Sequence, residues 1–161
     1  MVWRNKEGEI FLNKYGKIAK DFWTAIPHHF SNVSTDAFSI MPNHIHGILI
    51  IERDAVAVGN AYMRSLQNRT KMTLSKVVQQ YKASVTREIN AAQKEFCFEW
   101  QKSFYDHVLR NEKSLDNLRQ YIRYNHLKWE FDIENRGNIG VPHLKVCRDY
   151  YKQMIEGDSG R

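Results

Sequence analysis

The stretch from Met41 to Ile51 constrains the fold of this 161-residue chain more than any other. It reads Met-Pro-Asn-His-Ile-His-Gly-Ile-Leu-Ile-Ile, so a turn-forming Pro-Asn pair leads into a long apolar run. Because side chains alternate between the two faces of a strand, His44 and His46 point the same way, and Ile48 continues their face. Apolar residues on both faces are typical of a strand that is covered on two sides.

Two imidazoles side by side on one face of a strand can hold a divalent metal ion. A strand whose polar end carries two histidines would show the same spacing. On the spacing alone, these two interpretations have about equal weight.

Composition places the chain among ordinary globular proteins. Hydrophobic residues make up 42% of it and charged residues 26%, which suits one domain with a real core. We find no apolar run of membrane-spanning length and no signal peptide, and Cys97 and Cys147 stand alone, so we expect a cytoplasmic protein. The net charge of +6 favours a polyanionic partner.

Strand-forming residues recur in short runs along the chain. They lie at 8–13, 37–41, 44–51 and 100–109. We expect the second and third runs to form an antiparallel hairpin through the Pro-Asn turn, and the fourth to be a further strand with an aromatic entry.

Apolar residues at helical spacing predict a first helix that begins after Asn13, a capping residue, and ends at Pro27. His28 and His29 then lie in a loop. The polar, basic segment 53–72 is interpreted as a loop as well.

A second helix is expected to begin at Thr73 as its N-cap. Its buried stripe is Leu74, Val77, Val78, Tyr81, Val85 and Ile89. A third helix begins at Ser114 as its cap and runs toward Trp129, with Leu115, Leu118 and Ile122 facing the core.

Tyr121 and Asn125 lie four residues apart on this third helix, so they share one face. A tyrosine there is by default a packing residue. The functional interpretation makes Tyr121 a nucleophile and Asn125 an oxygen ligand beside it.

At this point the chain resembles a known family. Met-Pro-Asn-His-Ile-His at 41–46 matches the HUH motif of single-tyrosine transposases, and Trp-Gln-Lys-Ser-Phe-Tyr-Asp-His at 100–107 and Tyr-Ile-Arg-Tyr-Asn at 121–125 look like its later blocks. The chain is most similar to the REP-associated tyrosine transposases, which are akin to the transposases of the smallest bacterial insertion sequences. The resemblance runs from about Gly8 to about Asn135.

This resemblance implies an α+β fold, with a ferredoxin-like antiparallel sheet and helices on its faces. Residues 1–135 would be the transposase domain and 136–161 a C-terminal extension. The relatives begin with a strand that lies next to the histidine strand. Residues 1–6 are too short and polar to replace it, so we expect the sheet to lack its first strand. Relatives also usually carry a proline where this chain has His126.

The resemblance also implies roles for single residues. His44 and His46 would bind Mg²⁺ or Mn²⁺, and Asn125 would complete the protein ligands. Tyr121 would attack a DNA phosphate and form a 5′-phosphotyrosine link, which leaves a free 3′-hydroxyl. A phenol is a weak nucleophile at neutral pH because its ordinary pKa is about 10, and a metal ion that polarises the phosphate compensates for this.

The implied partner is single-stranded or hairpin DNA, bound by a monomer or a homodimer. Basic side chains would contact phosphates and aromatic ones would stack on bases. The candidates are Lys76, Lys82, Arg123 and Lys128 for phosphates, and Trp100, Phe104 and Tyr105 for bases.

Two further functions compete with the DNA strand transferase. One is a nucleic-acid-binding remnant of the same fold that has lost catalysis, which a missing strand would explain. The other is a metal-dependent phosphoesterase. The histidine-triad class needs a third histidine where this chain has Ile48, which weighs against it.

Overall fold

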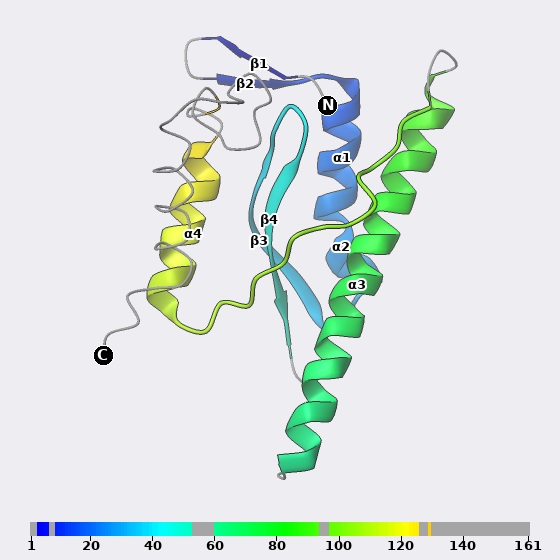
Figure 1. The fold of residues 1–161 in the computed structure, drawn as a ribbon. Helices are drawn as coiled ribbons and strands as arrows, with labels where there is room; N and C mark the ends of the chain where they lie inside the picture. The colour runs from blue at the N-terminus through cyan, green and yellow to red at the C-terminus, as the bar shows by residue number, and fades with distance from the viewer. Residues whose placement is uncertain (1–2, 7–8, 53–59, 94–96, 126–128, 130–161) are drawn as a thin grey trace. The chain divides into compact units, whose positions relative to one another are not determined.

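The computed structural model describes residues 3–6, 9–52, 60–93, 97–125 and 129. In chain order they form β1 (Trp3–Lys6), β2 (Glu9–Leu12), α1 (Lys14–Thr24), α2 (Ile26–His29), β3 (Val33–Ile40), β4 (Ile45–Ile51), α3 (Asn60–Ala91) and α4 (Glu112–Tyr124) (Figure 1). Helices thus accompany antiparallel strand pairs, so the expected α+β class is confirmed. None of the helices in the described ranges is long and apolar enough to cross a membrane.

The chain divides into two compact units, each built from segments far apart in the sequence. The first unit comprises Met1–Gly16, Asp36–Ile48 and Ser103–Arg161. The second unit comprises Lys17–Thr35 and Leu49–Lys102. The expected C-terminal extension, 136–161, lies outside the described residues.

The N-terminal strands form a sheet of their own. β1 pairs with β2 antiparallel, in a register that places Trp3 opposite Leu12 and Lys6 opposite Glu9. The strand expected at 8–13 is confirmed. Residues 3–6 also form a strand, but it pairs with β2, and in the described residues it does not take the place beside the histidine strand β4. The two strands are separated by only two residues in the sequence, so their pairing is local.

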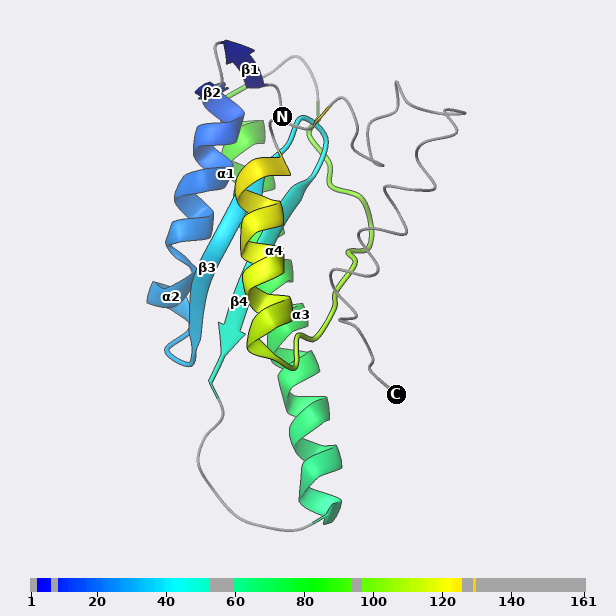
Figure 2. The same ribbon diagram turned by 90° about the vertical axis from the view of Figure 1, so that its left-hand side faces the viewer.

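The second sheet is the hairpin of β3 and β4 (Figure 1 and Figure 2). The backbone N–H of Met41 donates to the carbonyl of His44 across the turn, at 2.9 Å. The hairpin is confirmed, although β3 begins at Val33 rather than at 37. Ile48 is buried but Ile50 on the same face is 41% exposed, so the strand is not covered along its whole length. Within the described residues this sheet has two strands.

The first helix begins as expected. The side-chain oxygen of Asn13 accepts the N–H groups of Tyr15 and Gly16, which makes it the cap of α1. The helix ends at Thr24, before Pro27, and His28 and His29 belong to α2 rather than to a loop. Pro27 is tolerated there because N–H groups in the first turn of a helix have no partner within the helix.

Helix α3 begins at Asn60, so the prediction of a loop up to residue 72 and a cap at Thr73 is wrong. Segment 60–91 contains no glycine or proline, and polar helix formers continue the helix without an apolar stripe. The stripe itself is confirmed: Val77, Tyr81, Val85 and Ile89 are buried. Leu74 and Val78 are half-buried.

The segment predicted as a strand over 100–109 contains no strand. Residues 98 and 100, around the start of this segment, are hydrogen-bonded to helix α3 instead. The side chain of Asn90 accepts the N–H of Phe98 at 2.7 Å, and the indole N–H of Trp100 donates to the carbonyl of Lys82 at 3.1 Å. These bonds to side chains and helix carbonyls take the place of a strand neighbour.

Helix α4 begins one turn earlier than predicted. Its cap is Asn111, whose side-chain oxygen accepts the N–H of Ser114 at 2.8 Å. Ser114 is therefore inside the first turn, and its N–H is the group that is capped. Ile122 is buried as expected, whereas Leu115 and Leu118 are half-buried.

Candidate active site

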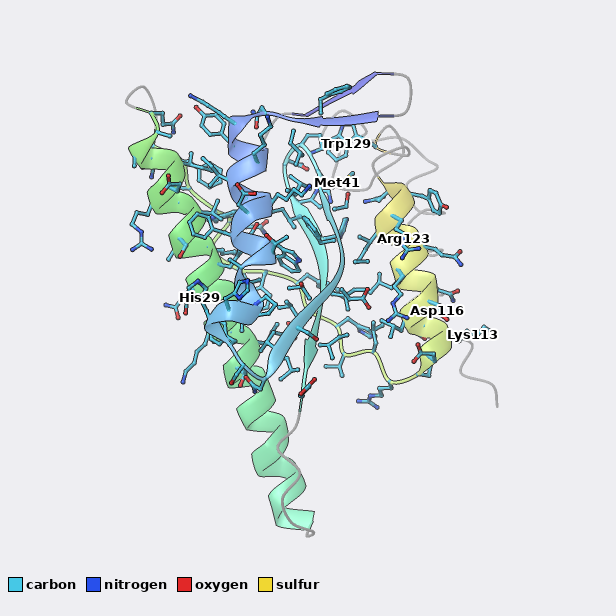
Figure 3. All side chains as sticks on the ribbon, turned by 180° about the vertical axis from the view of Figure 1, so that it is seen from behind. His29, Met41, Lys113, Asp116, Arg123 and Trp129 are labelled. Atoms are coloured by element: carbon cyan, nitrogen blue, oxygen red, sulfur yellow. The ribbon has the colours of Figure 1, made fainter. Side chains whose placement is uncertain are left out.

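All four residues predicted to carry chemistry lie in the first unit, and ring contacts join three of them. His44 directly precedes β4 after the Pro-Asn turn, His46 is the second residue of β4, and Tyr121 lies near the end of α4. Figure 3 labels Met41 at the turn end of the hairpin and Arg123 on α4. Strand alternation places both imidazoles on one face, and the helix supplies the tyrosine.

The two histidine rings converge on one point. Their Nε2 atoms are 2.8 Å apart, and the rings meet edge to face at 83° with centroids 4.5 Å apart. This is the convergence that the spacing of one residue predicts for a strand.

Asn43 determines which nitrogen of His44 carries the proton. Its side-chain oxygen lies 2.7 Å from Nδ1 of His44, and an amide oxygen can only accept, so Nδ1 donates. In the neutral ring, Nε2 of His44 then keeps a lone pair, aimed at Nε2 of His46. A fixed Nδ1–H donor is the usual arrangement that orients a histidine for metal binding through Nε2.

Tyr121 packs against the second histidine. Its ring and that of His46 are T-shaped, with centroids 5.5 Å apart and an interplanar angle of 75°. Asn125, one helical turn further on, caps α4 and is only 3% exposed. The helix therefore places a phenol hydroxyl and a buried amide on one side, as their spacing predicts.

Sequence reasoning missed an aromatic neighbour of the pair. The ring of Trp129 lies 6.0 Å from that of His44, tilted by 41°. A tryptophan shortly after a helix is a common packing residue, and nothing in its spacing indicates this contact. His126, which lies between Asn125 and Trp129 in the sequence, is outside the described residues.

Sequence reasoning also missed an ion pair between α4 and β3. Arg119 donates through Nε and Nη2 to one oxygen of Asp36, at 2.8 and 2.7 Å. This guanidinium holds the pKa of the Asp36 carboxyl below its usual value, mainly through the hydrogen bond and against a smaller opposing effect of burial. The signals were a carboxylate inside a strand and an arginine two residues before the tyrosine.

The residues predicted to contact DNA fall in both units. Phe104, Tyr105 and Arg123 are exposed in the first unit, and Lys76 is exposed in the second. Lys82 donates from Nζ to the carbonyl of Gln101 at 2.8 Å, and desolvation lowers its pKa. Trp100 is half-buried beside it, in contact with Phe98 and Tyr81. Lys128 lies outside the described residues.

The donor set fits a divalent metal ion. Two ligand atoms at right angles on one ion, with bonds of about 2.1 Å, lie about 3 Å apart. The Nε2 atoms lie 2.8 Å apart, which is the length of a hydrogen bond between the two rings and is also close to this separation. In the described part of the chain, no three side chains of His, Cys, Asp or Glu gather into a metal site. Asn125, water or substrate oxygens would therefore have to complete the coordination.

Comparison with known proteins gives one informative match. An uncharacterized protein of Haemophilus influenzae is 35% identical over 126 residues, which cover 75% of this chain and 69% of the relative. No family model matches the chain. No solved structure matches it either.

Proposed function

This chain belongs to the same family as the Haemophilus influenzae protein, and we propose that it is a DNA strand transferase of the single-tyrosine HUH type. It would cleave and rejoin single-stranded or hairpin DNA through a covalent phosphotyrosine intermediate. We place the chain in the REP-associated branch of that type. Its fold would then be a ferredoxin-like antiparallel sheet, in which β3 and β4 are two of the strands.

The observation that carries the proposal is the contact between Tyr121 and the histidine pair. Two ring nitrogens lie 2.8 Å apart, and the tyrosine ring lies against one of the two rings. These residues are 75 or more positions apart in the sequence. A packing tyrosine needs no convergent pair of imidazoles beside it, whereas attack on a phosphate needs both a nucleophile and a means to neutralise charge.

The chain's own residues have distinct tasks in the proposed reaction. His44 and His46 would hold Mg²⁺ or Mn²⁺ through Nε2, with the Asn125 side chain as oxygen ligand. When bound, the ion supplies positive charge to the phosphate oxygens. Asn43 holds the proton of His44 on Nδ1, so that Nε2 stays available.

Tyr121 would perform the covalent step. Its hydroxyl oxygen forms a bond to phosphorus as the bond from phosphorus to the 3′-oxygen breaks. The phenol loses its proton to solvent, and the departing 3′-oxygen gains one. The product is a 5′-phosphotyrosine and a free 3′-hydroxyl. Because the ester bond is conserved, attack by a 3′-hydroxyl rejoins the strand without a nucleotide cofactor.

A covalent trapping experiment tests this proposal. The chain is incubated with Mn²⁺ and labelled single-stranded or hairpin oligonucleotides, and adducts are separated on a denaturing gel. Tyr121→Phe keeps the ring and removes the hydroxyl, so it should fold, bind DNA and form no adduct. Tyr124→Phe is the matched control, because Tyr124 is on the same helix and 57% exposed. An adduct with Tyr121→Phe would remove Tyr121 as nucleophile.

A second candidate is a nucleic-acid-binding protein that keeps this arrangement without catalysis. The two-stranded sheet in the described ranges favours it, since a ferredoxin-like sheet would support the histidine strand on both sides. DNA binding by the wild-type chain without any adduct in Mn²⁺ would select this candidate.

A further inference from the structure

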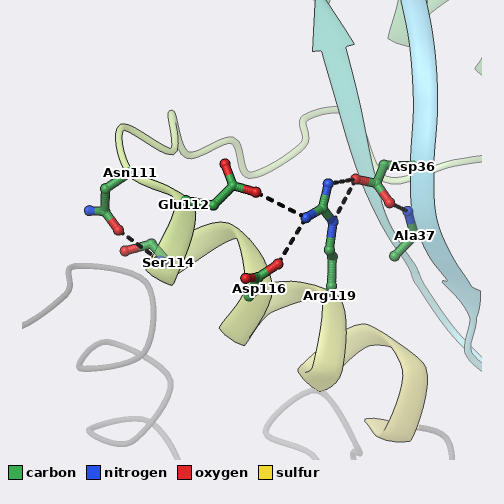
Figure 4. A network of polar contacts seen from close by, with 7 residues as sticks. All are labelled: Asp36, Ala37, Asn111, Glu112, Ser114, Asp116 and Arg119. Carbon is green, nitrogen blue, oxygen red and sulfur yellow. Dashed lines mark hydrogen bonds and ion pairs between the residues drawn. The ribbon is translucent and has the colours of Figure 1, made fainter.

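Arg119 connects the helix of the tyrosine to the hairpin of the histidines. Its guanidinium donates twice to one oxygen of Asp36 on β3, and the other oxygen of Asp36 accepts the N–H of Ala37 at 2.7 Å (Figure 4). The carboxylate is thus fixed to its own strand, and the guanidinium is fixed to the carboxylate. Paired N–H donors on one carboxylate give such a contact a defined direction.

The other side of the guanidinium is held within α4. Nη1 donates to Asp116 at 2.9 Å and lies 3.3 Å from the carboxylate of Glu112. Asp116 and Glu112 are largely exposed, whereas the side chains of Arg119 and Asp36 are only 28% and 20% exposed. The guanidinium therefore contacts three carboxylates. Two of them belong to α4, and the third and most buried one is Asp36 on β3.

The position of Arg119 on the helix explains what this contact can do. Arg119 and Tyr121 are two residues apart, which is about 200° around the helix axis. Arg119 contacts β3 through Asp36, and Tyr121 contacts β4 through His46. Two contacts at different angles, one to each strand of the hairpin, determine the rotation of the helix about its axis.

We propose that Asp36 and Arg119 are a positioning pair, which fixes the rotation of α4 and thereby holds Tyr121 against His46. The proposal rests on the proposed function for its catalytic meaning, but its geometric content is independent of it. The guanidinium of Arg119 is paired with carboxylates, so we do not assign it a contact with DNA phosphates. A shift of about 1 Å in a reacting group can cost about 100-fold in rate, so a small rotation of α4 matters.

The sharpest test reads the geometry itself. Aromatic ring currents shift the imidazole resonances of His46, and Tyr121→Leu gives the spectrum without that ring. Asp36→Asn and Arg119→Gln should each move the His46 resonances toward those of Tyr121→Leu, and the double variant should move them no further. Asp116→Asn is the matched control, because it removes a carboxylate from the same guanidinium without releasing β3. Its His46 resonances should stay at the wild-type positions.

Two results would overturn the proposal. The His46 resonances could stay unchanged in both Asp36→Asn and Arg119→Gln, or all three variants could move them equally, which would make the effect one of helix α4 alone. If Arg119→Gln fails to fold by far-UV circular dichroism, Arg119→Lys keeps the charge but loses the paired donors. It should give an intermediate shift, and wild-type resonances would again overturn the proposal.

Activity provides the second readout. With a fixed oligonucleotide and Mn²⁺, Asp36→Asn should lower kcat for adduct formation about 100-fold and leave KM within about twofold. A rise in KM with unchanged kcat would show a binding role and overturn the proposal. If the wild-type chain forms no adduct, the proposed function fails, while the His46 resonances still decide whether the pair positions Tyr121.

Discussion

Helix α3 and helix α4 are held in place by different kinds of contact. In the second unit, Val77, Val85 and Ile89 of α3 are fully buried, and Tyr81 packs edge to face on Trp23 of α1 at 5.5 Å. A polar bond also joins α3 to α1, because the Tyr81 hydroxyl donates to the carbonyl of Ala19 at 3.1 Å. Buried apolar side chains and one bond of defined direction thus occur together on this side of α3.

In the first unit, α4 buries Ile122 and is also held by directional polar contacts. These are the ion pair of Arg119 with Asp36 and the cap at Asn111, and the Asn125 amide at the other end of the helix is 3% exposed. Burial of apolar area is non-directional and contributes most of the folding free energy, whereas charged hydrogen bonds fix angles. We therefore expect mutations in α3 to change the free energy of unfolding, and mutations around α4 to change the position of Tyr121 and the activity.

The largest effect is expected at the histidine pair. His44→Ala and His46→Ala should each lower Mn²⁺-dependent DNA cleavage by about 1,000-fold or more, because the ion would lose a ligand, while thermal unfolding changes little. Cleavage and melting temperature are measured on the same preparations. His28→Ala is the control, since His28 is exposed in the second unit. Full activity in EDTA would contradict the assignment.

The next largest effect tests the apolar side of the comparison. Ile89→Ala should lower the free energy of unfolding by about 2–5 kcal/mol, because it leaves a cavity under a fully buried side chain. Glu88→Ala, exposed at the neighbouring position, should change it by less than about 0.5 kcal/mol. Urea titration measures both. The His46 resonances of the native fraction should be the same in both variants, and a change there would break the separation between stability and site geometry.

Local patterns predicted the parts of the molecule that depend on neighbours in the sequence. The spacing of Val77, Tyr81, Val85 and Ile89 determines which side of α3 is buried, and the single residue between His44 and His46 determines that their rings meet. Both follow from the repeat of one helix or one strand, so they need no knowledge of the rest of the fold.

The parts that sequence reasoning missed depend on distant partners or on backbone preference. Asp36 and Arg119 are 83 positions apart, so no local pattern could join them. The polarity of segment 60–72 favours a loop, yet the segment has no glycine or proline that would stop a helix. Segment 100–109 has the composition of a strand, but Trp100 donates to a helix carbonyl instead.

A smaller effect is expected at the directional bond of the apolar interface. Tyr81→Phe removes the bond to Ala19 and should lower the free energy of unfolding by about 1 kcal/mol at neutral pH. Burial raises the pKa of the Tyr81 hydroxyl above its usual value, so the unfolded chain releases this proton first as the pH rises. The wild-type chain should therefore lose stability above about pH 10.

The check is the difference between wild type and Tyr81→Phe in urea titrations at pH 8 and above pH 10. The difference should shrink or change sign at the higher pH, because the phenylalanine cannot ionise whereas the tyrosine in the unfolded wild-type chain does. An unchanged difference would mean that the hydroxyl is not buried against Ala19 in solution.

The smallest effect compares the two units as DNA-binding surfaces. Each cation that contacts a phosphate of single-stranded DNA contributes about 0.7 to the slope of log affinity against log salt. Lys76→Gln in the second unit and Arg123→Gln in the first should each reduce the slope by about that amount, since both side chains are exposed. Arg119→Gln should leave the slope unchanged, because the donors of Arg119 are taken by carboxylates.

A reduction with Arg123→Gln alone would confine the DNA to the unit of the histidine pair. If neither Lys76→Gln nor Arg123→Gln reduces the slope, phosphate contacts at both residues are contradicted. A reduction with Arg119→Gln would instead show that its guanidinium leaves Asp36 to contact DNA, and the contrast between a positioning cation and a binding cation on one helix would fail.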